Sequence, residues 1–99
     1  MFINTIEMPL IKSGKESEFL EWFKWSSGVY KKFDGFISRR LLKHTKGSGS
    51  YVILMEHENE KTFMNMHSSL EQKESMAKLK SLLEGSPAAK FYEVVIDTV

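Results

Sequence analysis

Hydrophobic and polar positions follow two periods along the chain, one of two residues and one close to 3.6 residues. Four stretches with the shorter period predict β-strands, at residues 2–10, 36–43, 50–58 and 89–99. Two stretches with the longer period predict helices, at residues 15–33 and 59–84, the second divided into two shorter helices. The order β-α-β-β-α-β predicts an α+β fold of the ferredoxin-like kind, a four-stranded antiparallel sheet with its helices on one face. We expect a single domain over residues 1–99.

Short polar motifs predict where the helices begin. Ser13 with Glu16, and Ser69 with Gln72, match the S-x-x-E/Q capping box, whose side chains bond to free backbone N–H groups of the first turn. The first helix is expected to end before Gly35, because glycine tolerates the left-handed turn that follows many helices.

The apolar runs Tyr51–Met55 and Tyr92–Ile96 place hydrophobic side chains on both faces of the predicted sheet. A strand with one face in water normally carries polar residues on that face. The helices cover only one face, so we expect a further surface to pack against the apolar residues of the other face. A second copy of the chain is the simplest candidate for that surface. The pattern therefore predicts a homodimer.

Composition narrows the range of partners. The chain has 14 Lys and Arg against 13 Asp and Glu, a net charge of +1 that is too balanced for a protein that neutralises phosphates, so we expect no nucleic-acid partner. It has no cysteine, which excludes disulfides, thiolate nucleophiles and cysteine-based metal centres, and no motif predicts a metal site. No apolar run approaches the ~20 residues that cross a bilayer, and no export signal is seen. We therefore expect a cytoplasmic protein without a membrane partner.

Two polar residues on apolar segments are the candidates for chemistry. His67 lies between the two short helices of residues 59–84, where its imidazole could remove a proton near neutral pH. The alternative is a helix-end histidine that interacts with the helix dipole. Asn4 interrupts an apolar strand face, so its amide needs a partner, either a ligand carbonyl or oxyanion or a neighbouring backbone group.

Aromatic side chains on the first helix offer either a ligand pocket or ordinary packing. Trp22 and Trp25 form an apolar stripe beside the main one, which is more typical of a core or an interface, and Tyr30 lies on the main stripe. His57 would line either a cleft or the dimer interface. In the pair Arg39-Arg40 the side chains point to opposite strand faces, and one of them could steer an acidic substrate.

Three segments of the chain resemble the antibiotic biosynthesis monooxygenase family. Phe33–Phe36 is similar to its x-x-P-G-F turn, with Asp34 in place of the proline, Tyr51–Glu58 to its third strand, and Glu60–His67 to its short helix. The resemblance implies a dimeric α+β barrel, in which two such sheets pack face to face. It also implies an enzyme that uses O₂ without metal or flavin to oxidise electron-rich polycyclic phenols, in a cleft between the helices and the sheet.

Carried onto this chain, the resemblance implies a small cofactor-independent monooxygenase with an electron-rich aromatic or quinol-type substrate. In that interpretation His67 acts as the base and Asn4 holds the oxyanion that forms. The substrate would be enclosed by Trp22, Trp25, Tyr30, Phe63, Met66 and His57.

Two other interpretations remain open at the level of sequence. A related branch degrades haem and relies on an asparagine, a tryptophan and a haem-ligating histidine, at positions that correspond here to about Glu7, to Met66 and to Met76. Because two of these positions are methionine, haem would have to bind in a different way, for example through His67. The third interpretation is a non-catalytic dimeric module that binds a small hydrophobic ligand.

Overall fold

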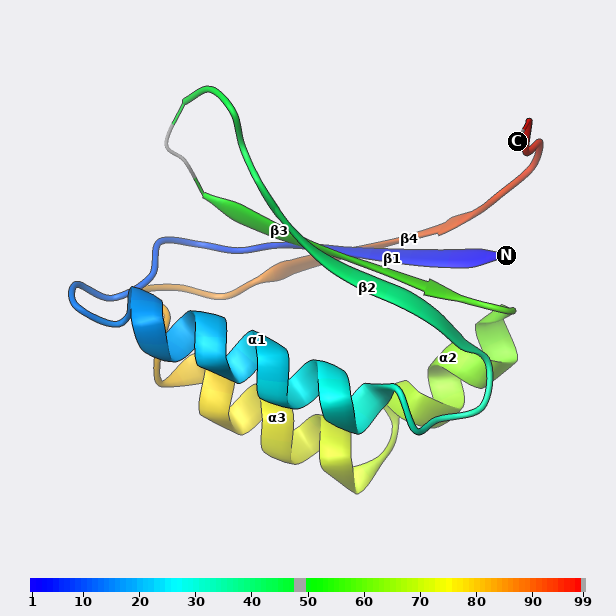
Figure 1. The fold of residues 1–99 in the computed structure, drawn as a ribbon, viewed down its shortest axis with the longest axis horizontal. Coiled ribbons are helices and arrows are strands. Elements are labelled where there is room, and N and C mark those ends of the chain that lie inside the picture. Colours follow the sequence, from blue (N-terminus) through cyan, green and yellow to red (C-terminus); the bar gives the residue numbers. More distant parts are fainter. Residues whose placement is uncertain (48–49, 99) are drawn as a thin grey trace.

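A computed structural model describes residues 1–47 and 50–98 as a four-stranded antiparallel sheet with three helices against one face (Figure 1). The sheet has the order β2-β3-β1-β4, with β1 at Phe2–Glu7, β2 at Phe36–Lys43, β3 at Tyr51–His57 and β4 at Ala88–Glu93. The helices are α1 at Glu16–Tyr30, α2 at Glu60–His67 and α3 at Leu70–Lys80. This topology confirms the predicted ferredoxin-like α+β fold. The tip of the β2–β3 hairpin at residues 48–49 and the last residue of the predicted final strand, Val99, lie outside the described residues.

The central strand β1 positions the only polar side chain on its helix-covered face. Phe2, Asn4 and Met8 are all buried there, in agreement with the predicted period of two. Asn4 lies opposite Met55 of β3 on one side and Phe91 of β4 on the other. The amide therefore sits in the middle of the sheet, beneath the helices.

The hydrophobic core consists of two clusters, one on either side of Asn4. The first lies under the middle of α1 and the end of α3, and its buried members are Met8, Phe19, Trp22, Ile53, Leu79, Leu82 and Leu83. The second lies under the end of α1 and α2, and its buried members are Phe2, Tyr30, Met55, Phe63 and Met66. Trp22 belongs to the buried stripe of α1, whereas the sequence pattern placed it in a separate stripe beside Trp25.

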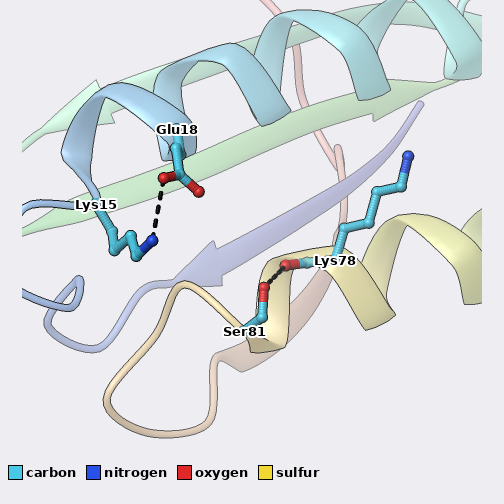
Figure 2. Close-up of polar contacts among 4 residues, drawn as sticks. All are labelled: Lys15, Glu18, Lys78 and Ser81. Atoms are coloured by element: carbon cyan, nitrogen blue, oxygen red, sulfur yellow. Dashed lines mark hydrogen bonds and ion pairs between the residues drawn. The ribbon is translucent and has the colours of Figure 1, made fainter.

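The predicted capping box at the start of α1 is wrong. Gly14 has a φ of +78°, and Lys15 donates its backbone N–H to the carbonyl of Lys12, so the chain is still turning at Ser13. The helix begins only at Glu16 and has no side-chain cap. Figure 2 shows what stands there instead, an exposed ion pair of 3.1 Å between Lys15 Nζ and Glu18 Oε1.

The predicted cap of α3 is confirmed in part. The Ser69 hydroxyl accepts from the backbone N–H of Gln72 at 3.1 Å, as a capping box requires. The Gln72 side chain does not reach back to the cap, because its Oε1 accepts a hydrogen bond from the Tyr30 hydroxyl of α1. At the other end of the helical segment the Ser81 hydroxyl donates to the carbonyl of Lys78 at 2.8 Å (Figure 2).

The sheet face away from the helices carries both apolar and polar side chains, with Thr5, Arg40 and Lys90 in the same row as Leu54. Alternation places Ile3, Leu42, Val52, Leu54 and Tyr92 on this face, and Figure 1 shows all three helices on the other one. Strand β4 is shorter than predicted and ends at Glu93, so the expected contribution of the following residues to the sheet is wrong. Val95 and Ile96 lie beyond it and are 91% and 82% exposed. Across the described residues, no helix is long and apolar enough to cross a membrane.

Candidate functional site

A cavity of about 110 Å³ lies between the helices and the sheet, where the two core clusters meet. Six of the side chains around it carry a nitrogen or oxygen atom, and the others are apolar. The lining residues are Asn4, Ile6, Trp22, Tyr30, Arg39, Ile53, Met55, Phe63, Met66, His67, Gln72, Met76, Pro87 and Ala89. An apolar protein cavity of ~150 Å³ binds benzene, so this one has room for about a single aromatic ring. An apolar hollow with a few convergent polar groups is the usual form of a small-molecule site.

Asn4 lines the cavity with an amide whose orientation is fixed by backbone carbonyls. The side chain is 4% exposed, and its Nδ2 donates to the carbonyl of Lys90 at 3.1 Å and, at 3.4 Å, to that of Thr5. Carbonyls can only accept, so the atom that faces them must be the NH₂ group. Within the described residues no donor contacts Oδ1, which leaves a hydrogen-bond acceptor for a ligand.

His67 stands at the mouth of the cavity. It is the last residue of α2, its side chain is exposed, and it lines both the cavity and a shallow outer groove beside Met64 and Phe91. Its ring stacks on Phe63, with centroids 5.4 Å apart and planes 19° from parallel. An imidazole in this place can face a bound ligand on one side and water on the other.

Tyr30 and Gln72 close the cavity between α1 and α3. Tyr30 is 2% exposed, and its hydroxyl donates to Oε1 of Gln72. Burial raises the pKa of Tyr30, while the neighbouring Ser75 hydroxyl and the positive charge of Arg39 lower it by less. The tyrosine is therefore neutral at physiological pH and acts as a hydrogen-bond donor.

Arg39 is the one side chain in the cavity lining with a permanent charge. Its Nη1 donates to the hydroxyls of Ser26 and Ser27, each at 2.8 Å, and to the carbonyl of Phe23 at 3.3 Å. Burial lowers the pKa of Arg39 to about 10, and the nearby Tyr30 raises it by less. The guanidinium remains protonated at neutral pH, so the cavity contains a partly buried positive charge.

Aromatic faces compensate this charge only in part. The guanidinium carbon lies 4.5 Å from the ring centroid of Phe23, 4.7 Å from that of Tyr30 and 5.3 Å from that of Trp22. Such contacts contribute about 0.5–2 kcal/mol each, whereas an ion removed from water without a counter-ion loses several kcal/mol of solvation. Within residues 1–47 and 50–98, no carboxylate forms an ion pair with Arg39.

Two of the predicted substrate contacts lie outside the cavity, and that expectation is corrected. Trp25 is 41% exposed on the outer side of α1, where the Nζ of Lys78 lies 3.9 Å from its ring centroid. His57 is completely buried under Phe63 and Phe36, whose rings meet it edge-on. The other predicted residues, Tyr30, Trp22, Met66, Phe63, Asn4 and His67, all line the cavity.

His57 is held by the first turn of α2. Its Nδ1 lies 3.0 Å from the Thr62 hydroxyl, which donates its own proton to the carbonyl of Asn59, so Nδ1 carries the hydrogen and Nε2 is left buried without a partner. Burial lowers the pKa of His57, and the charge of Glu58 raises it by less. The ring is neutral and belongs to the core.

Gln72 and Arg39 are the site residues that sequence reasoning assigned to other roles or left undecided. Gln72 was expected only as a helix cap, and it approaches Tyr30, 42 positions away, only after folding. Arg39 and Arg40 are adjacent arginines on one strand, and the sequence distinguishes them only by the sheet face to which each side chain points. Among the described residues no group of three or more His, Asp and Glu side chains is arranged to hold a metal ion.

Comparison with known proteins places this geometry in a family. The profile described as "Antibiotic biosynthesis monooxygenase" matches residues 1–78, which is more than three quarters of the chain. The chain belongs to the antibiotic biosynthesis monooxygenase family. No curated protein sequence matches it significantly.

Solved structures show the same fold at low sequence identity. A Deinococcus radiodurans protein described as a candidate antibiotic biosynthesis monooxygenase has a TM-score of 0.87 at 12% identity, over 100% of this chain and 97% of its own. Rv0793 from Mycobacterium tuberculosis gives 0.82 at 14%, over 100% of both chains. A conserved protein from Methanosarcina mazei Go1 gives 0.81 at 20%, over 93% of this chain and 91% of its own. The TM-scores, at these low identities, establish a shared fold.

The residues around the cavity do not fit haem. Met66 and Met76 line the cavity at the positions where the haem-degrading branch has tryptophan and histidine, and Glu7 lies outside it, 3.2 Å from His44. The cavity volume of about 110 Å³ is well below the ~300–1,000 Å³ of pockets for drug-sized ligands, and haem is at least that large. No step through haem is therefore derived for this protein.

Proposed function

We propose that the protein is a cofactor-independent monooxygenase that acts on a small, single-ring, electron-rich aromatic or quinol-type substrate. The observation that carries the proposal is the single-ring cavity with His67 at its mouth and the free acceptor of Asn4 inside it. Family membership supports O₂ as the oxidant. The small volume favours one ring over the polycyclic phenols that the family resemblance suggested.

His67 acts as the base in this proposal. Its imidazole removes the proton of a ring hydroxyl, and because its other side faces water, the proton can leave for solvent. The electron-rich phenolate then transfers electrons to O₂, and a C–O bond forms at an unsubstituted ring carbon ortho or para to the oxygen. Loss of water from the resulting peroxide gives a quinone, so phenol and O₂ balance against quinone and water.

Asn4 takes a different role from the oxyanion holder expected at first. Both of its amide protons face backbone carbonyls, and an oxyanion needs a donor. The unpaired Oδ1 instead accepts a hydrogen bond from a hydroxyl group on the ring. Asn4 therefore positions the neutral substrate before the proton is removed.

The experiment is O₂ consumption with a series of single-ring quinols, in buffer with a metal chelator. A positioned general base contributes about 10²–10⁴-fold to a rate, so His67→Gln should lower turnover at least about a hundredfold. The control is His44→Gln, which removes an exposed histidine far from the cavity. Equal oxidation by the wild type and by His67→Gln would refute the assignment, and oxidation of no quinol by the wild type would favour the ligand-binding module.

We also propose that two copies pair through the uncovered sheet face. Apolar side chains from all four strands lie on this face, and Leu54 sits near its middle, between Arg40 of β2 and Thr5 of β1. A lysine at this point would bury a charge in the interface, whereas it would meet water in a monomer. Leu54→Lys should change the mass measured by light scattering from dimer to monomer, and a monomeric wild type would overturn the pairing.

A further inference from the structure

Arg39 presents a partly unused hydrogen-bonding surface. The Nη1 end is held by Ser26, Ser27 and the carbonyl of Phe23. Among the described residues, Nε and Nη2 have no partner, and Nε is fully buried. Because Nε has no accessible surface, Nη2 is the nitrogen of the guanidinium fork that can reach a carboxylate oxygen. The serines therefore fix the arginine and leave Nη2 free for an anion.

The surroundings of Arg39 also lack negative charge. No residue that lines the cavity is acidic, and no carboxylate of the described chain pairs with the guanidinium. The neighbouring groups are the faces of Trp22, Phe23 and Tyr30 and hydroxyl dipoles. A charge that is partly desolvated, fixed in place and unpaired attracts an anion more strongly than the same charge in water.

We propose that the cavity selects a single-ring aromatic anion, whose carboxylate pairs with the guanidinium of Arg39. The aromatic and methionine side chains enclose the ring, and the volume of about 110 Å³ limits the ligand to one ring. The inference rests on the proposed function in so far as it narrows the substrate of that reaction to aromatic acids. Binding itself needs no turnover.

The primary experiment compares benzoate with its neutral near-isostere benzamide, by titration of ¹⁵N-labelled protein. The chain has two tryptophans, and only Trp22 lines the cavity, so its indole signal should move while that of Trp25 stays in place. Charge-assisted hydrogen bonds predict a Kd for benzoate roughly tenfold or more below that for benzamide. Equal affinities, no binding of either at millimolar concentration, or movement of Trp25 alone would overturn the proposal.

Variants at neighbouring positions locate the charge. Arg39 also borders an outer groove beside Arg40, and Arg40 is exposed on the opposite strand face. Arg39→Gln should abolish the preference for benzoate, and Arg40→Gln should keep it. Should Arg39→Gln fail to fold, Arg39→Lys retains the charge without the fork and must weaken benzoate binding several-fold. A preference lost equally in Arg40→Gln would assign the effect to the outer groove and refute the proposal.

The two proposals fail in different ways. Preferential binding of benzoate without oxidation of any aromatic acid would remove the monooxygenase reaction and keep the anion site. Oxidation of neutral quinols at the same kcat/KM as their carboxylated analogues would keep the reaction and remove the anion site. Chloride is the other anion that can occupy the place beside Arg39. Weaker benzoate binding in the presence of chloride, together with the expected ratio of the benzoate and benzamide Kd values in its absence, supports the anion site.

Discussion

Replacing Gly35 with alanine should destabilise the protein much more than the same change at Gly14. Both glycines have positive φ, +84° and +78°. A Cβ at Gly14 would meet nothing within 4 Å, whereas at Gly35 it would lie 2.4 Å from the Cβ of Thr62. The left-handed backbone costs alanine about 1–2 kcal/mol at either position, and the overlap adds about 1–3 kcal/mol at Gly35 alone. We expect losses of about 2–5 kcal/mol for Gly35→Ala and about 1–2 kcal/mol for Gly14→Ala.

The assay is urea unfolding followed by tryptophan fluorescence. For a small domain the free energy of unfolding falls by about 1–3 kcal/mol per molar urea, so the midpoint of Gly35→Ala should lie roughly 1 M below that of Gly14→Ala. The change in unfolded-chain entropy is the same for both substitutions and cancels in this comparison. Coinciding midpoints would show that Thr62 can move away freely, and would refute the tight approach between the α1–β2 turn and α2.

Two further substitutions test the buried groups beside the cavity. Because burial lowers the pKa of His57 from 6.5, the unfolded chain binds its proton first as the pH falls, so the free energy of unfolding should decrease below about pH 6.5 with a slope of at most about 1.4 kcal/mol per pH unit. The decrease should disappear in His57→Gln and persist in His44→Gln, as measured by urea midpoints from pH 7.5 to 5. Trp22→Phe should lower the free energy of unfolding by about 1–3 kcal/mol in thermal unfolding, because the indole Nε1 of Trp22 donates to the buried carbonyl of Ser75 at 2.9 Å. Trp25→Phe, its control, should lower it by less than about 1 kcal/mol. Equal losses for the two tryptophans would contradict the burial described for Trp22.

Local pattern was sufficient for the fold but not for its edges. Alternation of apolar residues predicts β1, because its side chains are buried on one face and the period of two follows that burial. The continuous apolar run Tyr51–Met55 predicts β3. The last strand was predicted too long, since Val95 and Ile96 are apolar but lie exposed beyond its end. The start of α1 was predicted too early, since Gly14 keeps the chain turning past Ser13.

The candidate site could be predicted where a polar residue interrupts an apolar face. Asn4 stands out for this reason, and His67 stands out because it ends a short helix. His57 interrupts its strand in the same way, and only the Thr62 contact shows that it belongs to the core. Arg39 acquires its environment from serines and aromatic rings on α1, and no local period encodes contacts between segments 12 to 16 residues apart.

The polar groups around the cavity differ in how firmly they are held, and this difference separates their roles. Asn4 is tied to Lys90, Tyr30 to Gln72, and Arg39 to two serines, so each presents a fixed donor or acceptor. Within the described part of the chain, His67 forms no side-chain hydrogen bond and is positioned only by its stacking on Phe63. A group that must take up a proton from a ligand and then release it to water needs this freedom, whereas groups that orient a ligand do not. The assignment of His67 as the base therefore follows from the hydrogen bonds of its neighbours as much as from its own position.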